Sequence, residues 1–218
     1  MFAEDTRTRE QLLDELKELG EILERSRMCT ANFFSEPAWN EEVHCPVLRL
    51  ALKSYKTVVY RNVYDRRRSL VLFLVQWLTL SSSTASVVPD LVPRHAGGIL
   101  QSKIGDYTIN LQPDKEMNNL IVDLLRSQPC ALQTINQTMS GYVRYLPIAI
   151  SIKTKTHDES DEDAMVQLAV WAAAHFNRLR MLTHENTVST TLPLLYIRGA
   201  EWSLRFACDR DKEIVCSF

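Results

Sequence analysis

The feature that most constrains the fold is an apolar segment near the C-terminal third of the chain, residues 164–182. Its helical pattern carries apolar side chains around most of the circumference: Met165, Val166, Leu168, Ala169, Val170, Trp171, Ala172, Ala173, Ala174, Phe176 and Leu179. A helix that is apolar on nearly every side needs neighbours around it, so we predict that it is buried against a sheet. The alanine run 172–174 lets the helix pack closely. Either Asp161 or Asp163, in the acidic turn before it, is expected to cap its N-terminus.

Four segments have the composition of strands, and they suggest the sheet. Asp106–Leu111 alternates polar and apolar residues, whereas Pro147–Lys155 is rich in β-branched residues. Leu192–Arg198 and Glu201–Cys208 are separated by two residues only, so we expect a tight hairpin that ends the fold. With the long helix, these strands predict an α/β (α+β) sandwich, in which helices flank a mixed central sheet.

The N-terminal part of the chain is predicted to be helical. Thr8 and Gln11 form a capping-box pattern, and apolar residues then recur at three- and four-residue spacing as one stripe: Leu12, Leu13, Leu16, Leu19, Ile22 and Leu23. This helix, over residues 8–27, either packs on the domain as an arm or dimerises with a second copy. A second helix is predicted over residues 37–52, with a kink or a fresh first turn at Pro46. A short helix is expected over Asn118–Arg126. We divide the chain into an arm, residues 1–35, and a domain, residues 36–218.

Composition excludes several classes of protein. The chain has 218 residues, 45% of them hydrophobic, and a net charge of −2, so a strongly basic nucleic-acid binder is not indicated. Its five cysteines are odd in number and lack CxxC spacing, which argues against a disulfide framework and for a reducing compartment. The longest apolar run, Leu70–Leu80, is too short for a membrane span, and it fits a buried strand or a buried helix. We therefore expect a cytoplasmic protein that does not enter membranes.

Charged side chains on the strand 147–155 mark a candidate site. Alternation predicts that three isoleucines share one face, Ile148, Ile150 and Ile152, and that three polar residues share the other, Ser151, Lys153 and Lys155. Two lysines on one face of an otherwise apolar strand need partners or water. If the strand that begins at Asp106 is adjacent, its carboxylate can supply one partner. The basic cluster Asp65–Arg68 is either a solvated loop or a contact for phosphate or carboxylate.

At these residues the chain resembles the fungal PD-(D/E)XK nuclease-like family, within the restriction-endonuclease-like superfamily. The resemblance runs from about residue 36 to 207, and Leu192–Trp202 also fits the family's ending. It rests mainly on the segments 37–52, Gly105–Tyr107, Ile135–Thr138, Pro147–Lys155 and Ala164–Arg180.

The resemblance implies a metal-dependent nuclease site, with one departure. In that superfamily an aspartate and a Glu-x-Lys strand hold Mg²⁺, which activates water to attack a phosphate. Asp106 matches the aspartate, Lys155 matches the motif lysine, and Gln167 matches a polar helix position seen in parts of the superfamily. The glutamate position, however, is Lys153.

A lysine at the glutamate position should abolish useful Mg²⁺ binding. It replaces an attraction with a repulsion, and at an effective dielectric of about 20 one unit-charge pair at 4 Å is worth on the order of 4 kcal/mol. We predict that Lys153 pairs with Asp106, so that an internal ammonium takes the place of the metal. The loop residue Glu159 is a poor replacement ligand, because loop residues give poor octahedral geometry.

Two classes of function remain open for such a site, and a third needs no catalysis. The first is a repurposed, cofactor-free and metal-free site that binds a hydrophobic small molecule, a terpenoid or polyketide, and promotes its cyclisation or isomerisation as a pericyclase-like enzyme of fungal secondary metabolism. Its expected catalytic residues are Asp106, Lys153, Lys155 and Gln167. Its expected substrate-binding residues are Ser151, Trp39 and His44, although His44 is also read as a structural hydrogen bonder. The second class is a Mg²⁺-dependent DNA endonuclease or exonuclease with a shifted ligand. The third is a non-catalytic interaction protein, which forms a homodimer through the N-terminal helix.

Overall fold

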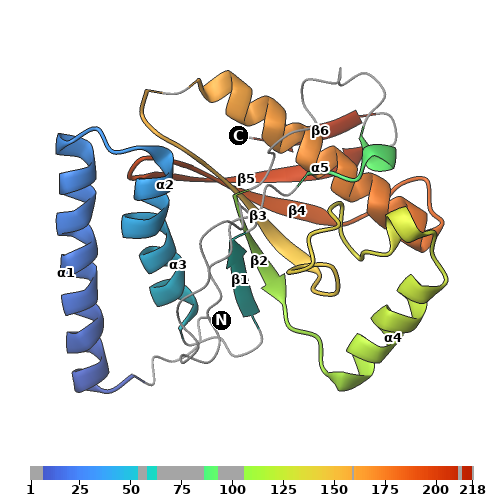
Figure 1. Ribbon diagram of the computed structural model, residues 1–218, viewed down its shortest axis with the longest axis horizontal. Coiled ribbons are helices and arrows are strands. Elements are labelled where there is room, and N and C mark those ends of the chain that lie inside the picture. Colours follow the sequence, from blue (N-terminus) through green and yellow to red (C-terminus); the bar gives the residue numbers. More distant parts are fainter. Residues whose placement is uncertain are drawn as a thin grey trace. The chain divides into compact units, whose positions relative to one another are not determined.

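The computed structural model describes residues 7–53, 58–62, 86–92, 106–158, 160–210 and 213–217 (Figure 1). Its elements are α1 (Arg9–Ala31), α2 (Glu36–Trp39), the π-helical turn η1 (Asn40–His44), α3 (Cys45–Leu52), β1 (Val58–Asn62), the 3-10 turn η2 (Pro89–Leu91), β2 (Tyr107–Leu111), α4 (Lys115–Arg126), the 3-10 turn η4 (Cys130–Leu132), β3 (Ile148–Lys155), α5 (Asp161–Thr183), β4 (Thr191–Arg198), β5 (Glu201–Arg210) and β6 (Glu213–Ser217). The predicted basic cluster Asp65–Arg68, the apolar run Leu70–Leu80 and Glu159 lie outside the described residues.

The chain forms two compact units, Met1–Ser54 and Tyr55–Phe218. The expected boundary after residue 35 falls inside the first unit, because the second predicted helix packs on the first. Ile22 and Cys29 of α1 are buried together with Trp39 and Val43. The predicted capping box of α1 is present, since the Thr8 hydroxyl accepts from the N–H of Gln11 while the Gln11 side chain accepts from the N–H of Thr8.

The predicted second helix runs from Glu36 to Leu52, with one π-helical turn in its middle. Pro46 has no N–H and its ring crowds the preceding turn, so an ordinary α-helical ladder cannot pass through it. The helix widens just before the proline, where the N–H of Cys45 donates to the carbonyl of Asn40, five residues back. Pro46 then occupies the first turn of α3. Of the two outcomes expected at Pro46, the structure therefore shows a fresh first turn.

The second unit is built on a six-stranded mixed sheet in the order β1-β2-β3-β4-β5-β6. β3 and β4 are parallel, and every other neighbouring pair is antiparallel. The mixed central sheet and the restriction-endonuclease-like class are confirmed. The expectation that two strands finish the fold is wrong, because β6 adds an edge strand after β5, and β1 adds another beside β2. Both are strands at the edges of the sheet, and neither segment shows the alternation of polar and apolar residues that marked the equally short β2.

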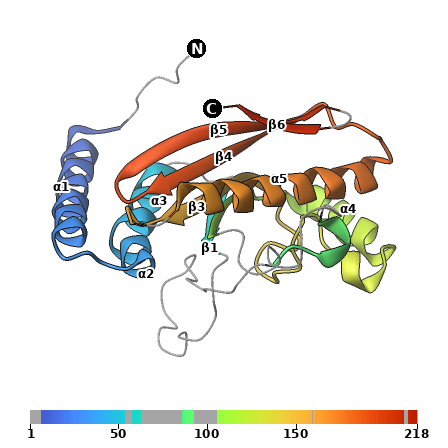
Figure 2. The ribbon, with the colours of Figure 1, turned by 90° about the horizontal axis from the view of Figure 1, so that it is seen from above.

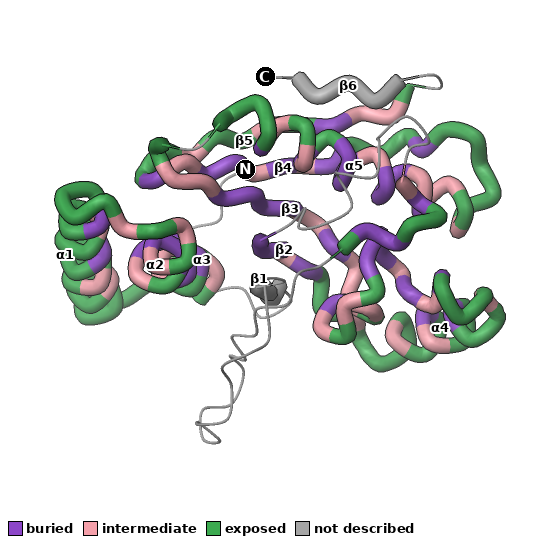
Figure 3. Tube along the Cα trace, turned by 45° about the horizontal axis from the view of Figure 1, so that its top comes forward, coloured by how far each residue is buried: buried purple, intermediate pink, exposed green. Residues whose placement is uncertain are grey.

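α5 packs along one face of this sheet (Figure 2). Trp171 and Ala174 are buried with Ile148, and Phe176 is buried with Leu194 of β4. The buried stretches of β3 and β4 run through the middle of the unit (Figure 3). The prediction that this helix packs against a sheet is thus confirmed, whereas Val166 and Ala169 are exposed, so the described residues do not surround it on every side. Its cap differs from the expectation: Ser160 is the N-cap residue and its hydroxyl accepts from the N–H of Asp163, so both aspartates lie in the first turn.

A β-bulge changes the predicted faces of β3. The register with β2 shifts between Ile109 and Asn110, because Ile109 is opposite Ile150 whereas Asn110 is opposite Ile148. The extra residue in β3 turns Ile148 to the face that α5 covers, where it joins the core around Trp171. The prediction that Ile148 shares a face with Ile150 and Ile152 is therefore wrong. The later part of the strand, where the candidate site lies, keeps its simple alternation.

The β4–β5 hairpin turns at Gly199, which has a positive φ of 56°. A Cβ atom at this position would come within 2.2 Å of the His157 ring, so both conformation and space require glycine. The N–H of Gly199 donates to the carbonyl of Lys155, and this bond ties the hairpin to the end of β3. Among the described residues, no helix is long and apolar enough to cross a bilayer.

The alanine run of α5 gives a matched test of close packing. Ala174 is fully buried in the core, whereas Ala173 is only partly buried. We expect Ala174→Leu to overpack the helix–sheet contact and to lower the free energy of unfolding by about 1–3 kcal/mol. Ala173→Leu adds the same atoms on the more open side and should cost less. Urea unfolding of both variants measures the difference, and equal losses would contradict this packing.

A buried histidine on α5 predicts acid sensitivity. Burial lowers the pKa of His175 to about 4, well below the value of about 6.5 that it has in an unfolded chain. Between these two values the unfolded chain takes up a proton that the folded chain does not. The free energy of unfolding should therefore decrease as the pH is lowered from about 6.5 to about 4, by up to about 1.4 kcal/mol per pH unit. His175→Gln should flatten that slope in urea unfolding at successive pH values, and identical slopes would contradict the prediction.

Candidate functional site

The candidate site lies where β2 begins and β3 ends. The antiparallel register places Tyr107 opposite Ile152, so Asp106 reaches the level of Lys153. The N–H of Asp106 donates to the carbonyl of Ile152, which fixes the aspartate at the end of the ladder. Strand pairing alone therefore brings together two residues that are 47 positions apart in the chain.

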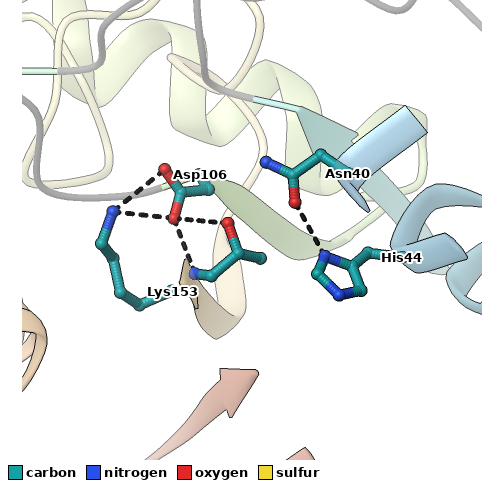
Figure 4. A network of polar contacts seen from close by, with 5 residues as sticks. Asn40, His44, Asp106 and Lys153 are labelled. Atoms are coloured by element: carbon teal, nitrogen blue, oxygen red, sulfur yellow. Dashed lines mark hydrogen bonds and ion pairs between the residues drawn. The ribbon is translucent and has the colours of Figure 1, made fainter. Parts of the chain in front are cut away.

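Asp106 and Lys153 form a buried ion pair (Figure 4). The Lys153 ammonium lies 3.2 Å from Oδ1 and 2.9 Å from Oδ2 of Asp106, and the two side chains are 5% and 3% exposed. The predicted pair is thus confirmed as a contact. A buried ion pair stabilises a fold only when further hydrogen bonds satisfy the charges.

Thr154 supplies two of those hydrogen bonds. Its N–H donates to Oδ2 of Asp106 at 2.7 Å, and its hydroxyl donates to the same oxygen at 3.1 Å. Sequence reasoning missed this residue, because alternation along a strand predicts that the side chain next to Lys153 points to the opposite face. The Asp106 carboxylate therefore accepts from one ammonium, one hydroxyl and one backbone N–H, all from β3.

Other predicted site residues lie on the same face of β3 or on α5. Ser151 is buried, and its hydroxyl accepts from the indole N–H of Trp171 at 2.9 Å, which anchors α5 to the strand. Lys155 is half-buried at the end of β3. Gln167 is half-buried on α5, and its side-chain oxygen is buried with no hydrogen-bond partner in the described part of the chain. The catalytic and binding roles expected for these residues stay predictions.

Trp39 and His44 belong to the other compact unit. They are buried, at 2% and 0% exposure, and their rings stack with centroids 5.7 Å apart. His44 Nδ1 lies 2.8 Å from Oδ1 of Asn40, also drawn in Figure 4. These contacts favour the structural reading of His44, and a role in binding substrate stays a prediction for both residues.

A second polar cluster, which the sequence did not reveal, lies at the N-terminus of α5. Tyr196 of β4 donates to Oδ1 of Asp161 at 2.5 Å, and Arg198 lies 3.1 Å from Oδ2 of the same carboxylate. Burial raises the pKa of the Tyr196 phenol, and the neighbouring Asp161 raises it further, so the phenol stays protonated and donates. In the parallel register Tyr196 is the partner of Lys153. The two residues are thus neighbours on adjacent strands, although the phenol donates to Asp161 and the ammonium to Asp106.

The residues at this place do not fit a divalent cation. Mg²⁺ prefers several oxygen ligands, mostly from carboxylates, in near-octahedral geometry. Here the Lys153 ammonium contacts both oxygens of the Asp106 carboxylate. Across the described ranges, no group of three or more His, Cys, Asp or Glu side chains is arranged to hold a metal ion. We therefore derive no reaction step through a metal.

The family of the chain follows from one comparison. A model of the PD-(D/E)XK nuclease superfamily matches residues 1–217, so the chain belongs to this superfamily. Searches of curated proteins and of solved structures each found no match. The superfamily and its fold are those expected from the sequence, whereas the fungal origin stays a prediction.

Proposed function

We propose that this chain is a repurposed member of the PD-(D/E)XK superfamily, whose Asp106 site works without a bound metal ion. The observation that carries the proposal is the Lys153 ammonium, which contacts both oxygens of Asp106 where a nuclease of the superfamily would place its metal. An ammonium carries one positive charge, and it cannot bind and polarise water as a divalent cation does. Hydrolysis of DNA by the superfamily's usual route is therefore not the activity that these residues favour.

The chemistry that suits such a site is a rearrangement within one hydrophobic molecule. A cyclisation or isomerisation redistributes bonds without consuming water, an oxidant or a second substrate, so no cofactor is needed. Binding the substrate in a reactive conformation and placing hydrogen-bond donors near its developing charge would accelerate such a reaction. Lys153, Tyr196 and the half-buried Lys155 are donors on neighbouring strand positions. We therefore propose a terpenoid or polyketide substrate and a pericyclase-like cyclase or isomerase activity.

The metal-free part of the proposal is tested by restoring the acidic residue. We expect the wild-type protein to show no specific Mn²⁺ binding in isothermal titration and no Mg²⁺- or Mn²⁺-dependent cleavage of duplex DNA. Lys153→Glu should create measurable Mn²⁺ binding, because two carboxylates would then face each other. The matched control Asp106→Asn/Lys153→Glu should lose that gain. Divalent-dependent cleavage by the wild type that disappears in Asp106→Ala would overturn the proposal.

The substrate class is tested separately. The protein is incubated with a panel of linear polyenes of terpenoid and polyketide type, and products are separated by chromatography with mass detection. The expected product has the same mass as its substrate and a different retention time, and its formation should slow in Lys155→Met. If no substrate of the panel binds or reacts, the cyclase or isomerase assignment fails while the metal-free site still stands.

A further inference from the structure

α1 carries an apolar face that the described residues of its own compact unit, 7–53, leave largely exposed. Five of its leucines are 42–66% exposed, namely Leu12, Leu13, Leu16, Leu19 and Leu23, and much of the helix surface is exposed in Figure 3. A row of large apolar side chains in water is costly, so such a face normally meets a partner.

The inner face of α1 is a different side of the helix. Ile22 and Cys29 are buried against α2, η1 and α3. Two ion pairs flank this contact, Glu18 with Lys53 at 3.7 Å and Arg25 with Glu42 at 3.5 Å. At about 100° per residue, the exposed leucines are centred roughly 110° around the helix from this inner face. Packing among residues 7–53 of the unit therefore leaves the leucine face available.

The spacing of these leucines is that of a coiled-coil seam. Leu12, Leu16, Leu19 and Leu23 follow one another at intervals of four, three and four residues, which are the d and a positions of successive heptads. A helix that only covers a globular core needs a wider and less regular stripe. The spacing also reads the same in both directions, so the seam is complementary to itself about a two-fold axis.

We propose that this face pairs with α1 of a second copy of the chain, and that the two helices run antiparallel. In this arrangement Leu16 lies against Leu19 of the second copy, and Leu12 lies against Leu23. The positions beside the seam are then complementary in size, because the large Leu13 side chain lies next to Gly20 of the second copy. A side chain at Gly20 would meet nothing within 4 Å in its own chain, so this position offers open space next to the seam. A parallel pair would place Leu13 near Thr8 and leave the space at Gly20 facing Glu15.

The dimer is tested on the full chain by sedimentation velocity over a roughly hundredfold range of concentration. We expect a reversible monomer–dimer equilibrium in the wild type. Leu16→Glu should weaken it at least about a hundredfold, because it places two charges at the centre of the seam. Leu120→Glu is the matched control, since Leu120 on α4 is also exposed, at 58%, and lies outside the seam. Circular dichroism shows whether each variant is folded.

Cysteine cross-linking tests the orientation in a Cys130→Ser background. A mixture of Leu12→Cys and Leu23→Cys chains should form a cross-linked dimer, whereas Leu12→Cys alone should not, because equivalent ends are far apart in an antiparallel pair. The background chain without added cysteines controls for other disulfides. Three results would overturn the proposal: a wild type that is monomeric throughout, a dimer that survives Leu16→Glu, or cross-linking of Leu12→Cys with itself. None of them bears on the Asp106 site, so this inference and the proposed function fail independently.

Discussion

Replacing Asp106 with asparagine is expected to lower the free energy of unfolding by about 3–5 kcal/mol, because the change leaves a buried ammonium without its counter-charge. Asparagine keeps the shape of the side chain, and its oxygen can still accept from Thr154. Its amide group, however, turns one of the two acceptors that face Lys153 into a donor. Urea unfolding at neutral pH measures the loss.

A single change at Lys153 and the double variant separate the energy of the Asp106–Lys153 interaction from the effects of each side chain on its other neighbours. Lys153→Met removes the ammonium and leaves Asp106 with two hydrogen bonds from Thr154, so it should cost less than Asp106→Asn. The double variant should be more stable than Asp106→Asn alone, because no charge is then left stranded. The coupling energy from this double-mutant cycle should reach about 2–3 kcal/mol. Additive losses would show that the two residues do not interact.

This pair was predictable from the alternation along β3 taken together with the family resemblance. Alternation along β3 puts Lys153 and Lys155 on one face, and the resemblance relates Asp106 to the same site. A buried lysine then has to find a carboxylate. The structure adds contacts that depend on how neighbouring strands pair. Tyr196 stands beside Lys153 only because β3 and β4 pair in parallel with that register, and no spacing within the sequence encodes it.

The errors in the predicted fold also come from features that depend on pairing between strands. The bulge that turns Ile148 toward α5 is a property of two paired strands, and a single strand with perfect alternation gives no sign of it. β1 and β6 were missed because five residues at a sheet edge need little apolar patterning. The π-helical turn before Pro46 is the exception, since the proline itself marked a disturbance of the helix there.

The motif Ile135–Thr138 supported the resemblance, and the structure gives it a physical role. Asn136 is completely buried, and its side chain links a loop to the start of β3 by hydrogen bonds. Its side-chain nitrogen donates to the carbonyls of Val143 at 2.5 Å and Leu146 at 2.9 Å, and its oxygen accepts from the N–H of Ile148 at 3.0 Å. If this side chain were removed, the carbonyl of Leu146 and the N–H of Ile148 would lose this partner, whereas the carbonyl of Val143 would still accept from the N–H of Leu146.

We expect Asn136→Ala to lower the free energy of unfolding by about 3–5 kcal/mol, because each buried backbone group left without a partner costs about 1–3 kcal/mol before relaxation. The neighbouring Gln137 is the matched control. It is equally buried, and neither atom of its amide has a hydrogen-bond partner in the described part of the chain. Gln137→Met keeps the length of the side chain and removes two unsatisfied polar atoms, so stability should stay within about 1 kcal/mol or rise.

Urea unfolding of the two variants shows whether the hydrogen bonds of Asn136 stabilise the fold. A large loss of unfolding free energy for Asn136→Ala, with little change for Gln137→Met, supports this structural role of Asn136. A neutral Asn136→Ala would show that the loop holds its place without these three bonds. A loss for Gln137→Met as large as that for Asn136→Ala would mean that the Gln137 amide has a partner beyond the described residues. In that case both side chains of the motif, rather than Asn136 alone, would hold the loop.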